Sequence, residues 1–189
     1  QALGVRLGIE ALHPMFCADR CVISSLGEAV DLAVLFPAEV VGVVVDTYHV
    51  WWDARLADEI ARAGRRIVSF QVCDWVLPLP ADTLLGRGHL GDGCIDFGAI
   101  TAAVTAAGYD GDVEVEIFNE QVWGAPPERT IATGQCACLT TAAAVEPSGM
   151  RAHGPFPSDP THTSAALRDS SMSTHSGRPR AMAVSMWTG

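Results

Sequence analysis

The chain has 189 residues and a formal net charge of −10. This length suits a domain with one hydrophobic core but falls short of the roughly 250 residues of a complete eight-unit α/β barrel. The acidic balance argues against a nucleic-acid or anionic membrane partner, and the short apolar runs predict neither a membrane span nor a signal peptide. Without C-x-x-C pairs, the six cysteines are interpreted as reduced thiols of a cytoplasmic protein. They are Cys17, Cys21, Cys73, Cys94, Cys136 and Cys138.

The first predicted unit is a strand, a loop and a helix. The apolar run Val5–Leu12 is interrupted by Glu10, and a carboxylate inside a buried strand is costly unless a metal, a partner or water compensates it. Ser25 and Glu28 have the spacing of a capping box. Apolar residues then keep helical spacing up to Pro37, so we expect a helix there.

The second unit contains the strongest signal in the chain. Val41–Val45 is a β-branched run typical of a parallel strand buried on both faces. It ends at Asp46, and His49, Trp51 and Trp52 follow at once. These residues indicate a site, because loops at the carboxyl ends of parallel strands carry chemistry. The alternative is that Asp46 caps the next helix and the aromatic residues belong to the core.

Two further units follow. The helix of the second unit is predicted over 54–63, with Asp53 as its N-cap. A third strand is predicted over 66–73, followed by a long loop rich in Pro and Gly, and loops of that length are usually functional. A helix capped by Asp96 leads to a fourth strand over 112–118. Repeated strand–loop–helix units predict a parallel α/β structure.

Each of the four predicted strands carries a polar side chain that could bind a metal near its carboxyl end. One such residue would be unremarkable, but four in succession are hard to explain as helix caps. Because these ends meet at one edge of a parallel sheet, we expect the four side chains to lie close together. They are Glu10, Asp46, Gln71 and Glu116.

The character of the chain changes after about Arg129. Pro126 and Pro127 are typical of a first helical turn, but the following sequence is rich in Thr, Gly, Ser, Pro and His without a period. We therefore predict two regions, a folded part over 1–129 and a low-complexity, disordered tail over 130–189. An interaction tail is one explanation; a shifted reading frame fits better, because the change falls within an element. We also expect the natural start to be missing.

The motifs together resemble the xylose isomerase-like TIM barrels, a family that includes sugar epimerases, hydroxypyruvate isomerase, inosose dehydratase and the type 2 AP endonucleases. The resemblance covers roughly residues 3–128 and corresponds to the last four βα units of the barrel. It rests on I-E-A-L-H-P, V-D-T-Y-H-V-W-W, S-F-Q-V-C-D-W, G-R-G-H-L-G-D-G and G-Y-D-G-D-V-E-V-E-I-F. The fold that it implies is a partial (β/α) barrel.

The resemblance implies one divalent metal, held in the family by Glu, Asp, His and Glu from these strands. Carried over, the ligands are Glu10, Asp46, Gln71 and Glu116. Gln71 stands where the family commonly has His, so the expected metal is Mn²⁺ or Mg²⁺ more than Zn²⁺. Asp74 could supplement Gln71 or cap a helix.

The implied activity is that of a metal-dependent isomerase or epimerase of a sugar or sugar phosphate. Glu10 and Glu116 would move a proton next to a carbonyl. His49, His13 and Arg87 would bind the substrate. Their alternatives are a helix histidine behind the site, a turn histidine and a solvated loop charge.

Other functions stay open. A lyase that dehydrates an inosose-like polyol needs the same groups. An AP endonuclease would need more zinc-binding histidines and a basic DNA face, which the net charge of −10 does not favour. The chain could also be an inactive fragment, or form a homo-oligomer that rebuilds a barrel from two halves, since a half barrel leaves two unpaired edges.

Overall fold

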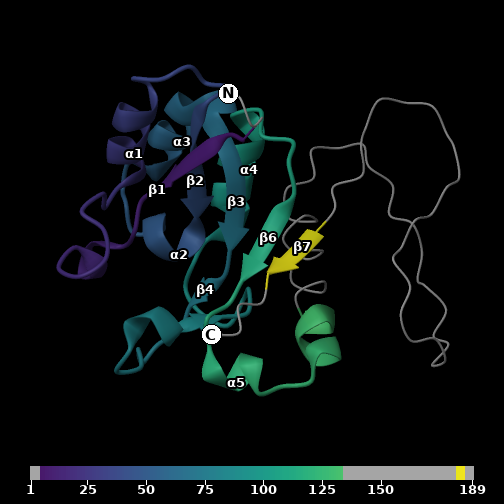
Figure 1. The fold of residues 1–189 in the computed structure, drawn as a ribbon. Helices are drawn as coiled ribbons and strands as arrows, with labels where there is room; N and C mark the ends of the chain where they lie inside the picture. Colours follow the sequence, from purple (N-terminus) through teal and green to yellow (C-terminus); the bar gives the residue numbers. More distant parts are fainter. Residues whose placement is uncertain (1–4, 134–181, 186–189) are drawn as a thin grey trace, which may run out of the picture. The chain divides into compact units, whose positions relative to one another are not determined.

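The computed structural model describes residues 5–133 and 182–185, which fall within one compact unit. Their centre is a five-stranded sheet in the order β1-β2-β3-β6-β7, with every neighbouring pair parallel (Figure 1). The four parallel strands predicted from the sequence are confirmed. The strands are β1 (Leu7–Glu10), β2 (Val41–Asp46), β3 (Ile67–Val72), β6 (Val113–Glu116) and β7 (Met182–Ser185).

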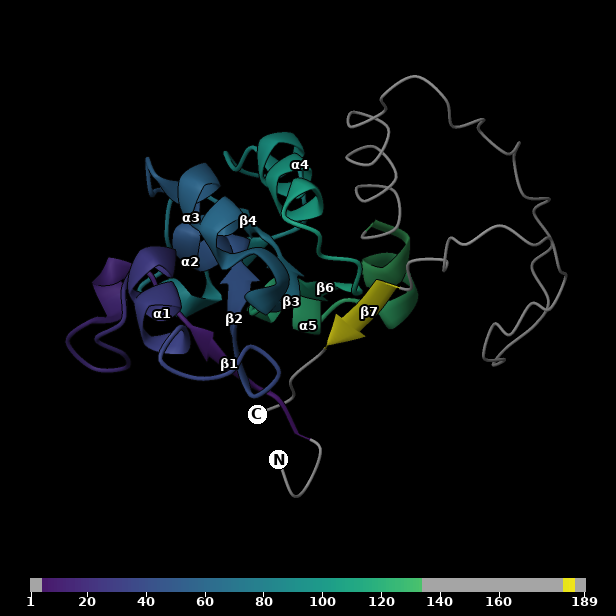
Figure 2. The ribbon, with the colours of Figure 1, turned by 90° about the horizontal axis from the view of Figure 1, so that it is seen from above.

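Three helices lie along one face of the sheet, as the view from above shows (Figure 2). They are α1 (Leu26–Ala33), α3 (Leu56–Ala63) and α4 (Phe97–Ala106). The predicted capping box of α1 is present, and Asp96 caps α4 as predicted. The shorter elements are η1 (Pro14–Phe16), α2 (Thr47–Val50), η2 (Gly64–Arg66), β4 (Asp74–Trp75), η3 (Thr83–Leu85), β5 (Arg87–Gly88) and α5 (Glu120–Trp123).

Successive side chains of each strand point to opposite faces of the sheet, so core residues and site residues lie on different faces. Val43 and Val45 of β2 are fully buried, and burying a valine side chain stabilises the fold by about 1.5–3 kcal/mol. Asp46 has the opposite parity in the strand and therefore belongs to the opposite face. In the sheet register Asp46 pairs with Gln71, and Gln71 pairs with Glu114. The polar residues predicted at the strand ends thus share the face opposite to the one lined by Val43 and Val45.

The start of the second helix differs from the prediction. The chain forms the short helix α2 directly after β2, because the Asp46 carboxylate accepts the Tyr48 N–H at 2.9 Å and caps it. The next helix, α3, begins at Leu56 and not at residue 54. Asp53 accepts the Arg55 N–H at 2.8 Å in the turn before α3, so its predicted role as the N-cap is wrong.

The long loop after β3 is held together by Asp74. Its carboxylate accepts the main-chain N–H groups of Gly91, Gly93 and Ile95 at 2.9, 2.8 and 3.1 Å, and that of Trp75 at 2.8 Å. No helix starts there, so the helix-cap interpretation of Asp74 is wrong, and four N–H donors leave it little capacity for a metal. The closed loop pairs β4 with β5 in antiparallel fashion.

The part of the chain after β6 contains a predicted helical turn and a strand that was not predicted. Residues 127–133 are helical, as the two prolines predict. Strand β7 pairs with β6 in parallel, within the region over 130–189 that was predicted to be disordered. The disorder predicted for the rest of the tail concerns residues 134–181 and 186–189, which lie outside the described residues.

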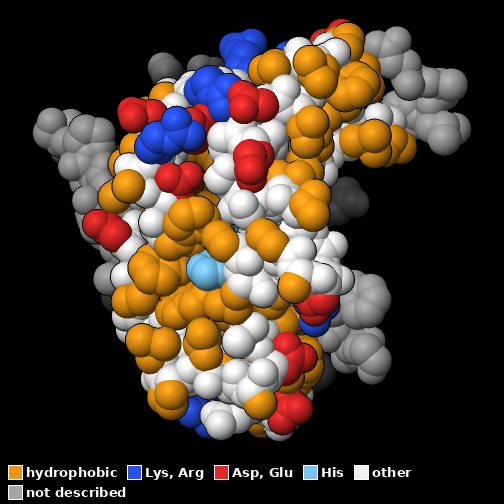
Figure 3. Space-filling view, turned by 90° about the vertical axis from the view of Figure 1, so that its left-hand side faces the viewer, with side chains coloured by type: hydrophobic (Ala, Val, Ile, Leu, Met, Phe, Trp, Pro, Cys, Tyr) orange, Lys and Arg blue, Asp and Glu red, His pale blue; other side chains and the backbone are white. Residues whose placement is uncertain are grey.

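Surface features bear on the expected partners. The face seen in Figure 3 carries hydrophobic side chains around a histidine, while basic side chains at its upper end alternate with acidic ones. This face therefore offers no continuous basic surface of the kind that a phosphate backbone requires. Within the described residues, every helix is too short or too polar to cross a membrane.

Candidate active site

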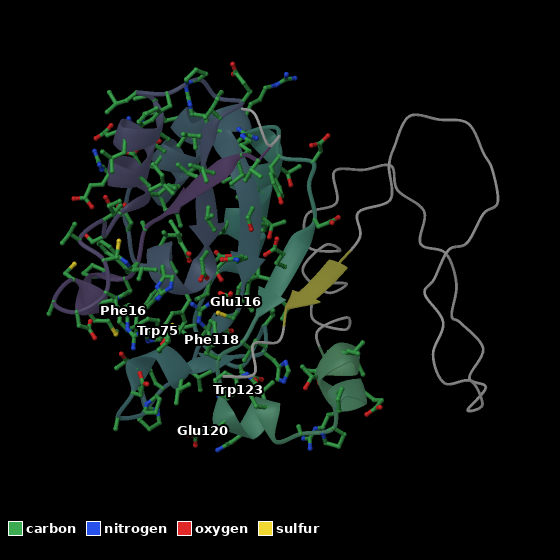
Figure 4. The ribbon with its side chains drawn as sticks, in the orientation of Figure 1. Phe16, Trp75, Glu116, Phe118, Glu120 and Trp123 are labelled. Carbon is green, nitrogen blue, oxygen red and sulfur yellow. The ribbon has the colours of Figure 1, made fainter. Side chains whose placement is uncertain are left out.

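Carboxylates from three strands meet at the carboxyl edge of the sheet. Asp46 Oδ2 lies 2.8 Å and Glu116 Oε2 lies 2.9 Å from Nη1 of Arg87. Glu10 joins them through His49, whose Nε2 is 3.9 Å from Glu10 Oε1. Figure 4 shows Glu116 at the end of β6, with the aromatic side chains of this edge nearby. Parallel strands thus bring together residues more than a hundred positions apart in the sequence.

Arg87 lies at the centre of this cluster. Its side chain is 2% exposed, and its guanidinium lies over the rings of Tyr48 and Phe118, with Cζ 4.8 Å from each centroid. Burial alone would lower the pKa of Arg87, but the charges of Asp46 and Glu116 raise it, so the side chain stays charged. The interpretation of Arg87 as a solvated loop charge is therefore wrong.

Asp46 was interpreted from the sequence either as a site residue or as a helix cap, and in the structure it is both. It is 1% exposed, and one carboxylate oxygen caps α2 while the other accepts from Arg87. A carboxylate offers about four lone-pair sites. Asp46 can therefore cap the helix, pair with Arg87 and still bind another cation.

His49 is held by contacts to both of its ring nitrogens. Nδ1 accepts the main-chain N–H of His13 at 3.1 Å, and Nε2 lies 3.1 Å from Arg87 Nη2 and 3.6 Å from Asp46 Oδ2. Burial lowers the pKa of His49 to about 4, although Asp46 opposes the change. The imidazole is therefore neutral near pH 7.

The two glutamates have the opposite shift. Burial, together with the charges of Asp46 and Glu116, raises the pKa of Glu10 to about 8. Burial also raises the pKa of Glu116, although Arg87 opposes it. A carboxyl group with a raised pKa can hold a proton near neutral pH and give it to a substrate, which is what a general acid–base catalyst needs.

Gln71 lies beside Asp46 in the sheet and makes one hydrogen bond. Its Nε2 donates to Glu114 Oε2 at 3.2 Å, and its Oε1 is buried without a partner among the described residues. A buried carbonyl oxygen without a donor is unusual, and it is a ligand that hard divalent ions accept. The assignment of Gln71 to a metal site with Glu10, Asp46 and Glu116 stays a prediction.

A group formed by Glu10, Asp46 and His49 also meets the spacing of a metal site, with ligand atoms within 4.8 Å of one another. The sequence placed His49 with the substrate and Gln71 with the metal. Both assignments stay predictions.

His13 has a local structural role. Its Nδ1 accepts the Met15 N–H at 3.3 Å and caps η1, as the turn-histidine interpretation expects. Its ring packs 4.8 Å from that of Trp75 and 5.8 Å from that of Trp52. Burial lowers the pKa of His13. The imidazole therefore borders the site among aromatic rings, where contact with a substrate stays a prediction.

The aromatic residues that contact Arg87, Tyr48 and Phe118, were not predicted as part of the site. Tyr48 lies between Asp46 and His49 in the sequence, and Phe118 comes two residues after Glu116. Their proximity to the predicted site residues was the only available signal. Their stacking on one guanidinium could not be read from it.

The fold and the site define a class: one half of a parallel β/α barrel with a carboxylate-rich centre at the carboxyl edge. Residues 1–142 match the family described as xylose isomerase-like TIM barrel, and the chain belongs to that family.

Three similar proteins support the assignment. An inosose isomerase of Bacillus licheniformis is 24% identical over 136 residues, covering 70% of this chain and 47% of that protein. The crystal structure of protein SMc04130 from Sinorhizobium meliloti 1021 is 45% identical, with a TM-score of 0.69, and covers 74% of this chain and 51% of that one. The IolI protein with a binding zinc atom is 22% identical, with a TM-score of 0.65 over 77% of this chain and 52% of that one. The chain thus spans about half the length of these proteins.

Proposed function

We propose that this chain carries the metal and acid–base centre of an isomerase or epimerase that acts on a hydroxy-ketone sugar or polyol. The observation that carries the proposal is the meeting of Glu10, Asp46 and Glu116 around Arg87 and His49. The similarity to an inosose isomerase favours a cyclic polyol ketone within that substrate class.

Four oxygen donors would hold the metal in this proposal. They are the carboxylates of Glu10 and Asp46, whose oxygens have the spacing of a metal site, the Glu116 carboxylate that shares Arg87 with Asp46, and the buried amide oxygen of Gln71. When bound, a divalent ion polarises the substrate carbonyl and makes the neighbouring C–H bond more acidic. The oxygen-rich set favours Mn²⁺ or Mg²⁺ over Zn²⁺.

The protein groups would then divide the proton transfer between two carboxyl groups. Glu10 on β1 and Glu116 on β6 come from strands on different sides of β2 and β3. One carboxylate takes the proton from the carbon next to the carbonyl, and the other carboxyl group returns a proton there or to the adjacent carbon. Arg87 stays cationic and stabilises negative charge as it develops on the substrate oxygens.

Exchange of carbon-bound hydrogen with solvent tests the proposal. The full chain is incubated in D₂O with Mn²⁺ and a panel of ketoses and inososes, and deuterium at the carbon next to the carbonyl is followed by NMR. The wild type should incorporate deuterium. The Glu10→Gln and Glu116→Gln variants should lose this rate by about 10²–10⁴-fold, the usual effect of removing a general base. Glu120→Gln, at an exposed position of α5, is the matched control and should leave the rate unchanged.

Each alternative has its own result. Loss of water from the substrate together with deuterium exchange would identify the lyase. A product formed without deuterium would point to hydride transfer. No exchange with any ketone, although calorimetry shows Mn²⁺ binding, would mean that the chain is an inactive fragment and would overturn the proposal.

A further inference from the structure

One neutral ring faces two donors at the centre of the site. The main-chain N–H of His13 points at Nδ1 of His49 at 3.1 Å, and Nη2 of Arg87 lies 3.1 Å from Nε2. A neutral imidazole has one N–H and one lone pair. It can therefore accept a hydrogen bond from His13 or from Arg87, but not from both at once.

The surroundings decide between the two tautomers. A main-chain N–H can only donate, and that of His13 has no other acceptor among the described residues. Arg87 can lose its contact with Nε2 more easily, because Nη1 keeps Asp46 and Glu116 as partners.

The charges around the ring favour the same tautomer. Asp46 Oδ2 at 3.6 Å and Glu10 Oε1 at 3.9 Å are acceptors on the Nε2 side. The negative charge of Asp46 favours a proton on Nε2, and its effect on the ring exceeds the opposing effect of Arg87.

We propose that the main-chain N–H of His13 holds neutral His49 as the Nε2–H tautomer, which makes His49 a hydrogen-bond donor into the site and removes it from the metal ligands. The role as donor to a substrate oxygen rests on the proposed function; the tautomer does not. A protonated Nε2 cannot bind a metal, because the proton occupies its lone pair. Although the group of Glu10, Asp46 and His49 has the spacing of a metal site, Nε2–H has no lone pair to give.

In this arrangement His13 acts as a positioning residue through its main chain and not through its imidazole. The two contributions can be separated by substitution. His13 has φ −51° and ψ 141°, which proline adopts and which the following Pro14 already requires. His13→Pro therefore removes the N–H with little change of backbone. His13→Ala removes the same imidazole and keeps the N–H.

The test is the protonation of each ring nitrogen, read from two-bond ¹H–¹⁵N correlations of the ¹⁵N-labelled full chain. The sample contains neither metal nor substrate and is kept at about pH 8, well above the usual histidine pKa of about 6.5. His49→Gln identifies the resonances. The wild type and His13→Ala should show a protonated Nε2 and an unprotonated Nδ1. His13→Pro should shift proton occupancy toward Nδ1, because Nε2 can then accept from Arg87.

Two results would overturn the proposal: a proton on Nδ1 in the wild type, or identical tautomer populations in His13→Pro and His13→Ala. If His13→Pro does not fold, the wild type and His13→Ala still decide the tautomer. Addition of Zn²⁺ to the wild type then tests the consequence, since the Nε2–H signal should persist if His49 is not a ligand. The measurement needs no turnover, so failure of the proposed function would not alter it.

Discussion

The ion pair between Arg87 and Asp46 should be strongly coupled, because both groups are buried. Their atoms are 2.8 Å apart, and the side chains are 2% and 0% exposed. At a charge separation of about 4 Å and an effective dielectric constant of about 20, the attraction is about 4 kcal/mol. Arg87→Met would leave Asp46 buried with the Tyr48 N–H as its remaining donor. We expect it to lower the free energy of unfolding by about 3–5 kcal/mol.

A double-mutant cycle isolates this interaction. Asp46→Asn should cost less, about 1–3 kcal/mol, because Arg87 keeps Glu116 as a partner. The double variant Arg87→Met/Asp46→Asn contains no uncompensated Asp46 charge. Its loss of stability should therefore be smaller than the sum of the single losses, by about 2 kcal/mol or more. Urea denaturation of the metal-free chain, followed by circular dichroism, measures each free energy of unfolding.

The surface pair of Arg62 and Asp31 is the matched control. It is shorter, at 2.6 Å, but its side chains are 42% and 71% exposed, so water screens the attraction. Its coupling, from Arg62→Met and Asp31→Asn, should stay below about 1 kcal/mol. Equal coupling for the two pairs would show that burial does not set the strength of the Arg87 contact, and would refute the reasoning.

Three further predictions concern the site and its loop. The raised pKa of Glu10, about 8 in the folded chain, means that the native state holds a proton which the unfolded state releases near pH 4–5. The free energy of unfolding of the metal-free chain should therefore fall as pH rises from about 5 to about 8, and Glu10→Gln should abolish this part of the pH dependence in urea titrations. Gly93→Ala should destabilise the loop by about 1–3 kcal/mol, because its Cβ would lie 2.1 Å from the Trp75 carbonyl oxygen. Gly98→Ala, within α4 and without such a clash, should instead stabilise by about 0.5–1 kcal/mol in the same assay. Gln71→His should tighten Zn²⁺ binding more than Mn²⁺ binding in calorimetric titrations, and equal effects on both ions would contradict the assignment of Gln71 as a ligand.

The sequence by itself determined the repeated units and the polar strand ends. The β-branched run Val41–Val45 has one reasonable conformation, a buried strand, and the capping box of Ser25 and Glu28 fixes where α1 begins. Local signals of this kind depend only on neighbouring residues, so they can be interpreted without knowing the rest of the structure. The repeated units predicted that the first four strands run parallel.

Tertiary structure decided what the site residues contact. Nothing local in the sequence distinguishes a solvated Arg87 from a buried one. Its burial depends on residues distant in sequence, among them Tyr48 and Phe118, whose rings both contact its guanidinium. Asp74 illustrates the same limit, since its four N–H partners exist only once the loop has closed.

The state of His49 also could not be read from the sequence. The sequence places His49 three residues after Asp46, but the position of its proton depends on the main-chain N–H of His13, 36 residues away. Protonation responds to distances of a few ångströms between groups on different elements. Packing sets those distances, and therefore only the folded chain determines which groups in this site donate and which accept.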